Sequence, residues 1–134
     1  QMLKMKYMIV GFITVFTLNT SLLAKASENG DPARGREVFA AKCTPCHGQT
    51  GHGDGPGAAS LQPKPRNLSD TYISALNDDL LFKAISEGGA AMGKSPAMPS
   101  WKFALSEDDI WNVIAYIKQD ICKCEHKEEV KENK

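Results

Sequence analysis

Isoleucine and valine recur every three or four residues near the carboxyl end of the chain, at Ile110, Val113, Ile114 and Ile117. This spacing puts them on one face of an α-helix. Ser106 stands just ahead of the pattern, and Asp109 follows it by three residues, as in a capping box. The pattern therefore predicts a helix over residues 106–119.

Two further segments have helical patterns. Asp31 followed by Pro32 is a favourable helix start, and residues 32–42 continue it. Gly35 interrupts this helix at a cost of about 1 kcal/mol relative to alanine, so we expect another backbone to come close there. A middle helix is predicted over residues 77–87, with two aspartates in its first turn.

Long irregular stretches separate the predicted helices. Glycine and proline recur through residues 48–66, where they exclude a continuous helix or strand. Residues 90–103 carry two more prolines. Loops of this length in a small domain are commonly functional. The pattern as a whole predicts three to four helices separated by long loops.

The amino-terminal segment is typical of a secretory signal peptide. Lys4 and Lys6 precede an apolar run, and Ala24 and Ala26 supply the small residues of a cleavage site. We expect residues 1–26 to be removed on export to the periplasm or an equivalent compartment. A folded domain over 27–121 and a charged, flexible tail over 122–134 then remain. The alternative is an uncleaved membrane anchor, although a spanning helix needs roughly 20 apolar residues.

Export also changes the charge. The full sequence has 16 basic and 16 acidic residues, and residues 1–26 contain three lysines and no acid. The mature chain therefore has 13 basic and 16 acidic residues, a net charge of −3. This charge argues against binding to nucleic acid and favours partners with a basic docking patch.

The chemistry of the chain is concentrated in Cys43-Thr44-Pro45-Cys46-His47. Two thiols three positions apart and an adjacent imidazole form the pattern for covalent attachment of a c-type haem. Each thiol can bond one vinyl group of the porphyrin, and the histidine can ligate the iron. A zinc site would need a second ligand pair at suitable spacing, and a thioredoxin-like motif would follow a β-strand. The motif therefore predicts one covalently bound haem c.

Two methionines are candidates for the sixth position of the iron. Met98 is flanked by Pro96 and Pro99, which stiffen the backbone around a flexible thioether. Met92 lies among glycines, where little would hold it, and core packing is the alternative for both. We predict His47 and Met98 as the axial ligands.

The segment from Asp31 to Ile117 resembles class I cytochromes c. The likeness includes Gly35 and Phe39, the cysteine motif, the run that ends at Leu68, Met98-Pro99-Ser100-Trp101, and a last helix with Trp111 and Tyr116. The loop before Leu68 is similar to that of short bacterial cytochromes, including haem domains of terminal oxidases. The resemblance implies an all-α fold around one haem, with the first and last helices crossing at Gly35.

The resemblance also implies roles for single residues. It agrees with His47 and Met98 as axial ligands, and Leu68 is the apolar residue that we expect against the ring. In the family a proline carbonyl accepts a hydrogen bond from the proximal histidine, which fixes the ring orientation. Pro56 and Pro63 are both open for this role.

A second cysteine pair, Cys122 and Cys124 with His126 beside it, follows the last helix. It is not a haem motif, because the thiols are too close together. In an oxidising compartment the simple interpretation is a local or intermolecular disulfide. Two thiols and an imidazole also suit Cu(I) or zinc.

The sequence thus predicts an exported electron carrier rather than an enzyme. Its partners would be redox proteins of a respiratory chain, met transiently, with no small-molecule substrate and no nucleic acid. Three alternatives remain: a fixed haem subunit of a larger membrane oxidoreductase, a haem peroxidase or sensor with a labile sixth ligand, and a metal-carrying module based on the second cysteine pair.

Overall fold

The computed structural model describes residues 30–124, so the predicted signal peptide and His126 lie outside the described residues. Within that range the chain is helical and contains no β-strand, which confirms the all-α prediction. The helices are α1 (Pro32–Lys42), α2 (Thr44–His47), α3 (Thr71–Ser74), α4 (Asp78–Glu87) and α5 (Glu107–Tyr116). Short 3-10 turns lie at Ala58–Ser60 and Ala90–Met92, and a π turn at Ile117–Ile121 follows α5.

Each of the three long helices begins at a side chain that caps it. Asp31 accepts hydrogen bonds from the first backbone N–H groups of α1, and Asn77 accepts one from the first turn of α4. The hydroxyl of Ser106 accepts from the backbone N–H of Asp109 at 3.1 Å and donates to its carboxylate at 2.8 Å. These bonds satisfy donors that a helix start leaves unpaired. The predicted start of each long helix is therefore confirmed to within one residue.

The end of the last helix differs from the prediction. The α-helix stops at Tyr116, and the backbone N–H of Cys122 donates to the carbonyl of Ile117 at 2.7 Å. This bond spans five residues instead of four, which defines a π turn. The apolar spacing that predicted an α-helix to residue 119 is compatible with both geometries, so the pattern alone could not distinguish them.

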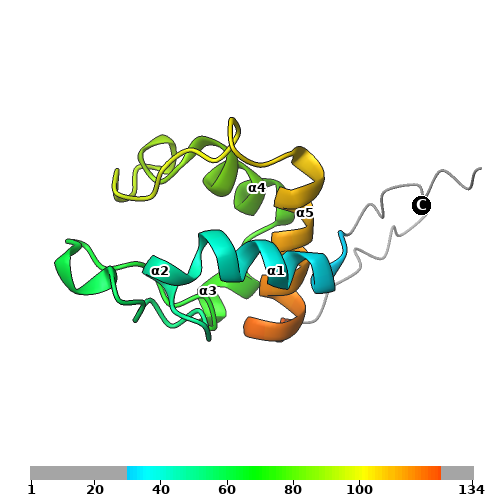
Figure 1. The fold of residues 1–134 in the computed structure, drawn as a ribbon, viewed down its shortest axis with the longest axis horizontal. Coiled ribbons are helices and arrows are strands. Elements are labelled where there is room, and N and C mark those ends of the chain that lie inside the picture. The colour runs from blue at the N-terminus through cyan, green and yellow to red at the C-terminus, as the bar shows by residue number, and fades with distance from the viewer. Residues whose placement is uncertain (1–29, 125–134) are drawn as a thin grey trace, which may run out of the picture.

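The first and last long helices, α1 and α5, cross at close range (Figure 1). A Cβ added to Gly35 would overlap the carbonyl of Asn112 and would lie 2.9 Å from the Cβ of Tyr116. The ring of Tyr116 also packs on Phe39 of α1, with centroids 5.4 Å apart. The close approach expected at Gly35 is confirmed, and it explains why a helix-destabilising residue stands there.

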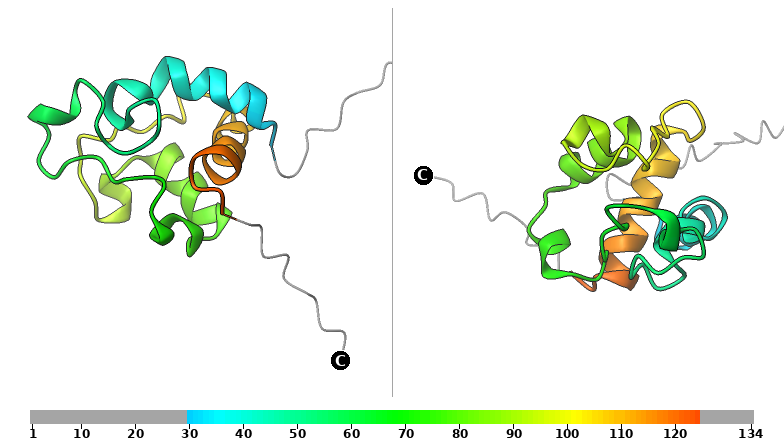
Figure 2. Two further views of the ribbon diagram at one scale, coloured as in Figure 1. Left: turned by 90° about the horizontal axis from the view of Figure 1, so that it is seen from below. Right: turned by 90° about the vertical axis from the view of Figure 1, so that its left-hand side faces the viewer.

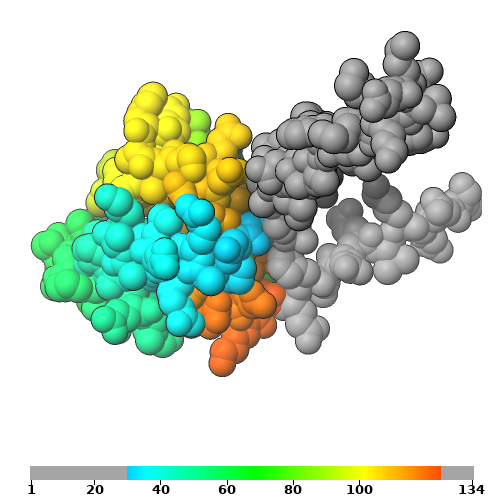
Figure 3. Space-filling model, turned by 45° about the vertical axis from the view of Figure 1, so that its right-hand side comes forward, coloured from blue at the N-terminus to red at the C-terminus, as the bar shows by residue number. Residues whose placement is uncertain are grey.

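The core lies where α1, α4 and α5 meet, and α4 and α1 flank different sides of α5 (Figure 2). Its buried members are Phe39, Ile73, Leu81, Ile85, Ile110, Val113, Ile114, Tyr116 and Ile117. In the space-filling view α1 lies across the face between the 90–105 stretch and the end of the carboxy-terminal helix (Figure 3). No helix in the part of the chain that the structure describes is long and apolar enough to cross a membrane.

Candidate haem-binding site

A cavity of about 820 Å³ lies between the two long loops, and apolar groups form most of its lining. Its size is within the range of sites that hold small molecules and cofactors. The wall formed by α4 and α5 includes Leu81, Ile85 and Val113. All five residues predicted to contact haem are in the lining: Cys43, Cys46, His47, Leu68 and Met98. The fold thus brings together residues that are up to 55 positions apart in the chain.

The turn α2 presents the cysteine motif to this cavity. The carbonyl of Cys43 accepts hydrogen bonds from the N–H groups of Cys46 at 3.1 Å and His47 at 2.8 Å. Positions i, i+3 and i+4 share one face of a helical turn. Both thiols and the imidazole therefore lie on the same side of the backbone, and Cys43 and Cys46 are free of any disulfide.

Alternate glycines pack the following loop against the motif. Gly53, Gly55 and Gly57 donate their N–H groups to the carbonyls of His47, Cys46 and Pro45 at 2.8, 3.2 and 2.9 Å. A Cβ on Gly55 would lie 2.5 Å from the Pro45 oxygen, so a larger residue could not approach this closely. The sequence predicts an irregular and functional loop here, but not its bonds to the motif. The glycine at every second position from 51 to 57 is the sequence signal that could have revealed this close packing.

The imidazole of His47 is partly shielded from water. Burial lowers the pKa of His47, and the neighbouring backbone of Arg66 opposes that shift only in part. Among residues 30–124, no group forms a hydrogen bond of standard geometry with the buried Nδ1 of His47. The ring is therefore neutral at pH 7 and keeps a lone pair for a metal ion.

The sequence left Pro56 and Pro63 open as the source of a carbonyl that supports His47. Because no group among residues 30–124 forms a standard hydrogen bond with Nδ1 of His47, the role of either proline stays a prediction. The backbone of Arg66 is the neighbour that raises the pKa of His47.

The thiol of Cys43 is kept in its protonated form at pH 7. Burial, and to a lesser degree the neighbouring Cys46, raises the pKa of Cys43 to about 11. Thioether attachment would need both cysteines in the reduced state. Cys43 and Cys46 form no disulfide, so both sulfurs would be available to hold a haem.

The loop that carries Met98 is fixed to the end of α4. The N–H of Gly89 donates to the carbonyl of Met98 at 3.0 Å, and a Cβ on Gly88 would lie 2.9 Å from that oxygen. The hydroxyl of Ser100 donates to the carbonyl of Ser86 at 2.7 Å. The flanking prolines were expected to give this support, but the direct contacts come from two glycines and a serine.

Met92 lines the same cavity, so the fold brings both candidate thioethers to it. The two methionines differ in how firmly the surrounding structure holds them. Met98 packs against the core, whereas Met92 is not among the described residues that do. Met92 ends a single 3-10 turn and is followed by Gly93, where an added Cβ would meet nothing within 4 Å.

The family model for cytochrome c matches residues 32–120. The chain belongs to the cytochrome c family. The cytochrome c6 of Bryopsis maxima is 30% identical over 92 residues, which cover 69% of this cytochrome and 94% of the relative. The cytochrome c6 of Picosynechococcus sp. is 33% identical over 109 residues, which cover 78% and 81% of the two chains.

Solved structures share the fold of this cytochrome. A chain of the reducing HAO-like protein complex of Kuenenia stuttgartiensis superposes with a TM-score of 0.56 at 27% identity, covering 68% of this chain and 43% of that one. The KustC0563 c-type cytochrome superposes with a TM-score of 0.50 at 21% identity, covering 63% and 94%. The second likeness concerns the fold alone.

Family membership settles the cofactor and the general activity. Cytochromes c carry a covalently bound haem c and transfer electrons through it, and this cytochrome does the same. Its cavity fits that group, because it combines two free thiols, an imidazole with an unpaired buried nitrogen, two thioethers and apolar walls.

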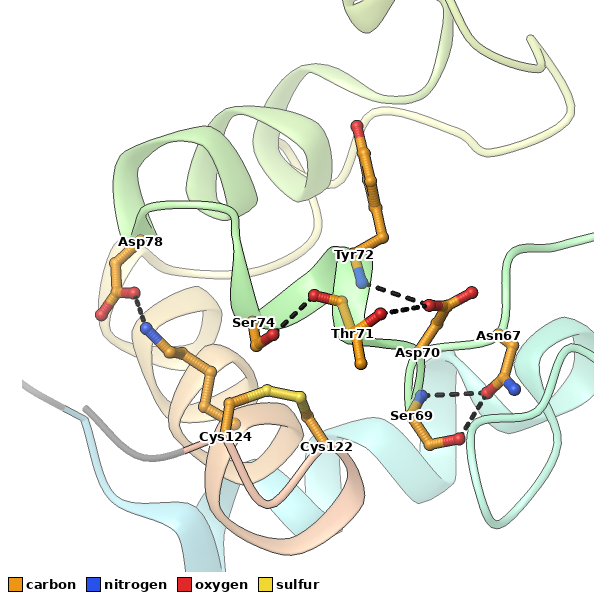
Figure 4. Close-up of a disulfide and its surroundings, with 10 residues drawn as sticks. Asn67, Ser69, Asp70, Thr71, Tyr72, Ser74, Asp78, Cys122 and Cys124 are labelled. Carbon is orange, nitrogen blue, oxygen red and sulfur yellow. Dashed lines mark hydrogen bonds and ion pairs between the residues drawn. A yellow bond between two sulfur atoms is a disulfide. The ribbon is translucent and has the colours of Figure 1, made fainter. Parts of the chain in front are cut away.

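The second cysteine pair lies apart from the cavity. Cys122 and Cys124 are joined in a disulfide, so the structure supports the local disulfide among the alternatives for these residues (Figure 4). His126 lies outside the described residues. Among residues 30–124 there is no cluster of three or more histidine, cysteine or acidic side chains that could hold a metal ion.

Proposed function

We propose that this cytochrome is an exported one-electron carrier, with haem c attached through Cys43 and Cys46 and its iron held by His47 and Met98. The observation that carries the proposal is a single cavity lined by both thiols, the imidazole and a core-supported thioether. The bound haem supplies an iron centre that alternates between the ferric and ferrous states. The location rests on the signal-like sequence of residues 1–26.

The chain's own residues have separate tasks in this proposal. Cys43 and Cys46 fix the cofactor by thioether bonds, which prevents its loss. His47 offers a neutral ring nitrogen to the iron, oriented by the glycine-rich loop bonded to its backbone carbonyl. Leu68 and the apolar residues of α4 and α5 exclude water, which limits the reorganisation that accompanies a change of charge.

Histidine and methionine together favour electron transfer over catalysis. A methionine ligand raises the reduction potential and leaves no open position for a substrate. The rival peroxidase or sensor would need a labile sixth ligand. The hydrogen bond between Gly89 and Met98, together with core packing, supports a firmly held Met98.

Paired methionine variants test the ligand assignment. The ferric wild type should show the weak long-wavelength absorption band that marks a methionine–iron bond. We expect Met98→Ala to abolish the band and to lower the reduction potential, while the matched variant Met92→Ala leaves both unchanged. Loss of the band in Met92→Ala alone, or its absence in the wild type, would contradict the proposal. Intact mass of the exported protein reports covalent haem and the removal of residues 1–26 at the same time.

The charge around the cavity indicates what kind of redox protein docks there. Four cations line it, namely Lys42, Lys64, Arg66 and Lys94, and all four residues are exposed. None of these four forms an ion pair with another residue of the 30–124 range. Asp70 is the one carboxylate in the lining, and it caps α3.

We therefore propose that the electron-transfer partner presents an acidic patch. Four cations outweigh one carboxylate, and the two propionates of a haem c reduce this excess without reversing it. The net negative charge of the mature chain had favoured a basic patch, but the groups nearest the partner decide the local field. Small and transient contacts are typical of redox encounters.

A fixed place in a larger assembly is the second candidate. The observation that favours it is the likeness to a chain of the reducing HAO-like protein complex, whose length this cytochrome covers only in part. Co-purification with an oxidoreductase at a constant ratio would support that role, whereas recovery as a free monomer from the exported fraction supports the carrier.

A further inference from the structure

The disulfide between Cys122 and Cys124 has no task in electron transfer through haem, and it adds little to the fold. Its Cα atoms are 5.1 Å apart and one residue separates the cysteines. The stabilisation that a disulfide provides grows with the length of the loop that it closes. A loop of this size constrains the unfolded chain very little, while α5 is already anchored by its buried residues Ile110, Val113 and Ile114.

The residue between the two cysteines carries local strain and charge. Lys123 has a φ of 53° and is the one non-glycine residue of the 30–124 range with a positive φ. This conformation is uncommon for a residue with a side chain, and such strain gathers at functional sites. Lys123 is also exposed, and both cysteines are partly exposed. An ammonium group next to a reachable disulfide attracts an attacking thiolate.

The disulfide ends the π turn that packs behind the haem cavity. Cys122 and Cys124 donate their N–H groups to the carbonyls of Ile117 and Lys118, at 2.7 and 2.9 Å. Ile117 lines the cavity itself. In Figure 4 the disulfide closes the turn on the side that faces α3, whose residues Tyr72 and Ile73 also line the cavity.

A second contact connects the π turn to the glycine-rich loop that follows the cysteine motif. A Cβ on Gly51 would lie 2.7 Å from Cγ2 of Ile121 and 3.3 Å from the Cβ of Leu68. Ile121, Gly51 and Leu68 thus pack together, and the N–H of Leu68 donates to the Gly51 carbonyl at 2.7 Å. Because Leu68 lines the cavity, a shift of the turn at Ile121 reaches the haem surroundings directly.

We propose that Cys122 and Cys124 are a thiol–disulfide exchange site for a dithiol protein, and that its state changes the haem surroundings through Ile121 and Leu68. One thiolate of the partner attacks a sulfur of the disulfide, forming a mixed disulfide and releasing one cysteine thiolate. The partner's second thiolate then attacks the mixed disulfide. Cys122 and Cys124 gain two electrons and take up two protons, and the partner leaves as a disulfide.

Alkylation of the folded holoprotein tests the exchange. Ascorbate keeps the iron ferrous in every sample, so that a dithiol cannot act through the haem. After treatment with dithiothreitol under native conditions, iodoacetamide should add two groups to the peptide that contains Cys122 and Cys124. The rate should be within about tenfold of that for the same peptide in isolation. Modification only after denaturation would overturn the proposal.

Proton NMR of the ferrous protein tests the link to the cavity. Reduction of the disulfide should shift the methyl signals of Leu68 and Ile121, and reoxidation by oxidised dithiothreitol should restore them. A Cys122→Ser/Cys124→Ser variant should show the shifted signals from the start and should not respond to the dithiol. Unchanged methyl signals would refute the coupling. Exchange does not depend on the axial ligands, so it should persist in Met98→Ala and be judged separately from the proposed function.

Discussion

Asn112 is a polar residue buried at the crossing of α1 and α5, and it serves two purposes there. Its side-chain oxygen accepts a hydrogen bond from the backbone N–H of Asp31 at 2.6 Å. Its backbone carbonyl faces Gly35, where a hydrogen atom is all that fits. The side-chain amide of Asn112 and the absence of a side chain at Gly35 therefore set the helix crossing. Together they fix the position from which α1 leads into the cysteine motif.

Replacing Gly35 by alanine tests this contact. Alanine is the better helix former, yet its methyl group would overlap the Asn112 carbonyl, and overpacking of this kind costs about 1–3 kcal/mol. We expect Gly35→Ala to lower the free energy of unfolding by that amount in urea titrations of the holoprotein. The exposed neighbour Arg34 provides the control, since Arg34→Ala should change stability by less than about 0.5 kcal/mol. A Gly35→Ala protein as stable as the wild type would mean that the helices separate without cost.

At the level of elements, an ion pair joins the π turn to the start of α4. Lys118 and Asp78 are in direct contact, and the side chain of Lys118 is 10% exposed against 33% for Asp78. A buried charge without its partner is costly, whereas a half-exposed one is rehydrated. The two halves of this pair should therefore respond differently to mutation.

Asp78→Asn should destabilise more than Lys118→Met. The first leaves an ammonium group buried and uncompensated, for which we expect a loss of about 2–4 kcal/mol. The second removes the buried charge, keeps the apolar stem and leaves a carboxylate that water can reach, so about 1 kcal/mol is expected. Urea unfolding of both variants measures the difference. The exposed pair Lys102 and Glu87 serves as reference, because Lys102→Met should cost less than about 0.5 kcal/mol. Equal losses for the two halves of the buried pair would contradict the argument.

The elements also show what could be read from the sequence. The three long helices were predicted because apolar spacing and a capping side chain agreed at each start, as at Ser106. The single-turn helix α3 was missed, since four residues show no periodicity and Asp70 was the one cap that marked it. The cavity residues were identified through the motif at Cys43, the prolines that flank Met98, and the resemblance. The approach of the Arg66 backbone to His47 and the hydrogen bond from Gly89 to Met98 could not be predicted. Both depend on the folded path of the chain, which the types of these residues do not reveal.

At the scale of the whole molecule, charge is unevenly distributed. The cavity lining holds four cations and one carboxylate, whereas acidic residues fill the first turns of α4 and α5. Long-range steering depends on such a distribution and weakens as salt screens it. The molecule should therefore present its haem edge to negative partners despite its negative total charge.

Small redox reagents of opposite sign test this field. We expect the reduced protein to react with ferricyanide faster at low salt than at high salt, and with a cationic cobalt complex in the opposite order. Lys42→Glu should lower the low-salt ferricyanide rate by about three- to tenfold. Lys83→Glu, an identical charge change at an exposed site outside the cavity lining, should lower it less than twofold. Equal effects at both positions would show that total charge, and not its placement, governs the rate.

The point at which the chain enters the domain has a consequence for how it can be tethered. Residue 30 lies against α5 near Trp111, and the eleven residues of α1 carry the chain from there to Cys43. At 1.5 Å per residue this separates the entry point from Cys43 by about 16 Å, roughly the length of the helix. If the leader were kept as a membrane anchor, the domain would be attached to it at the end of α1 opposite the cysteines (Figure 1). In such a protein the cysteine motif would face away from the bilayer and toward the extramembrane domain of a partner.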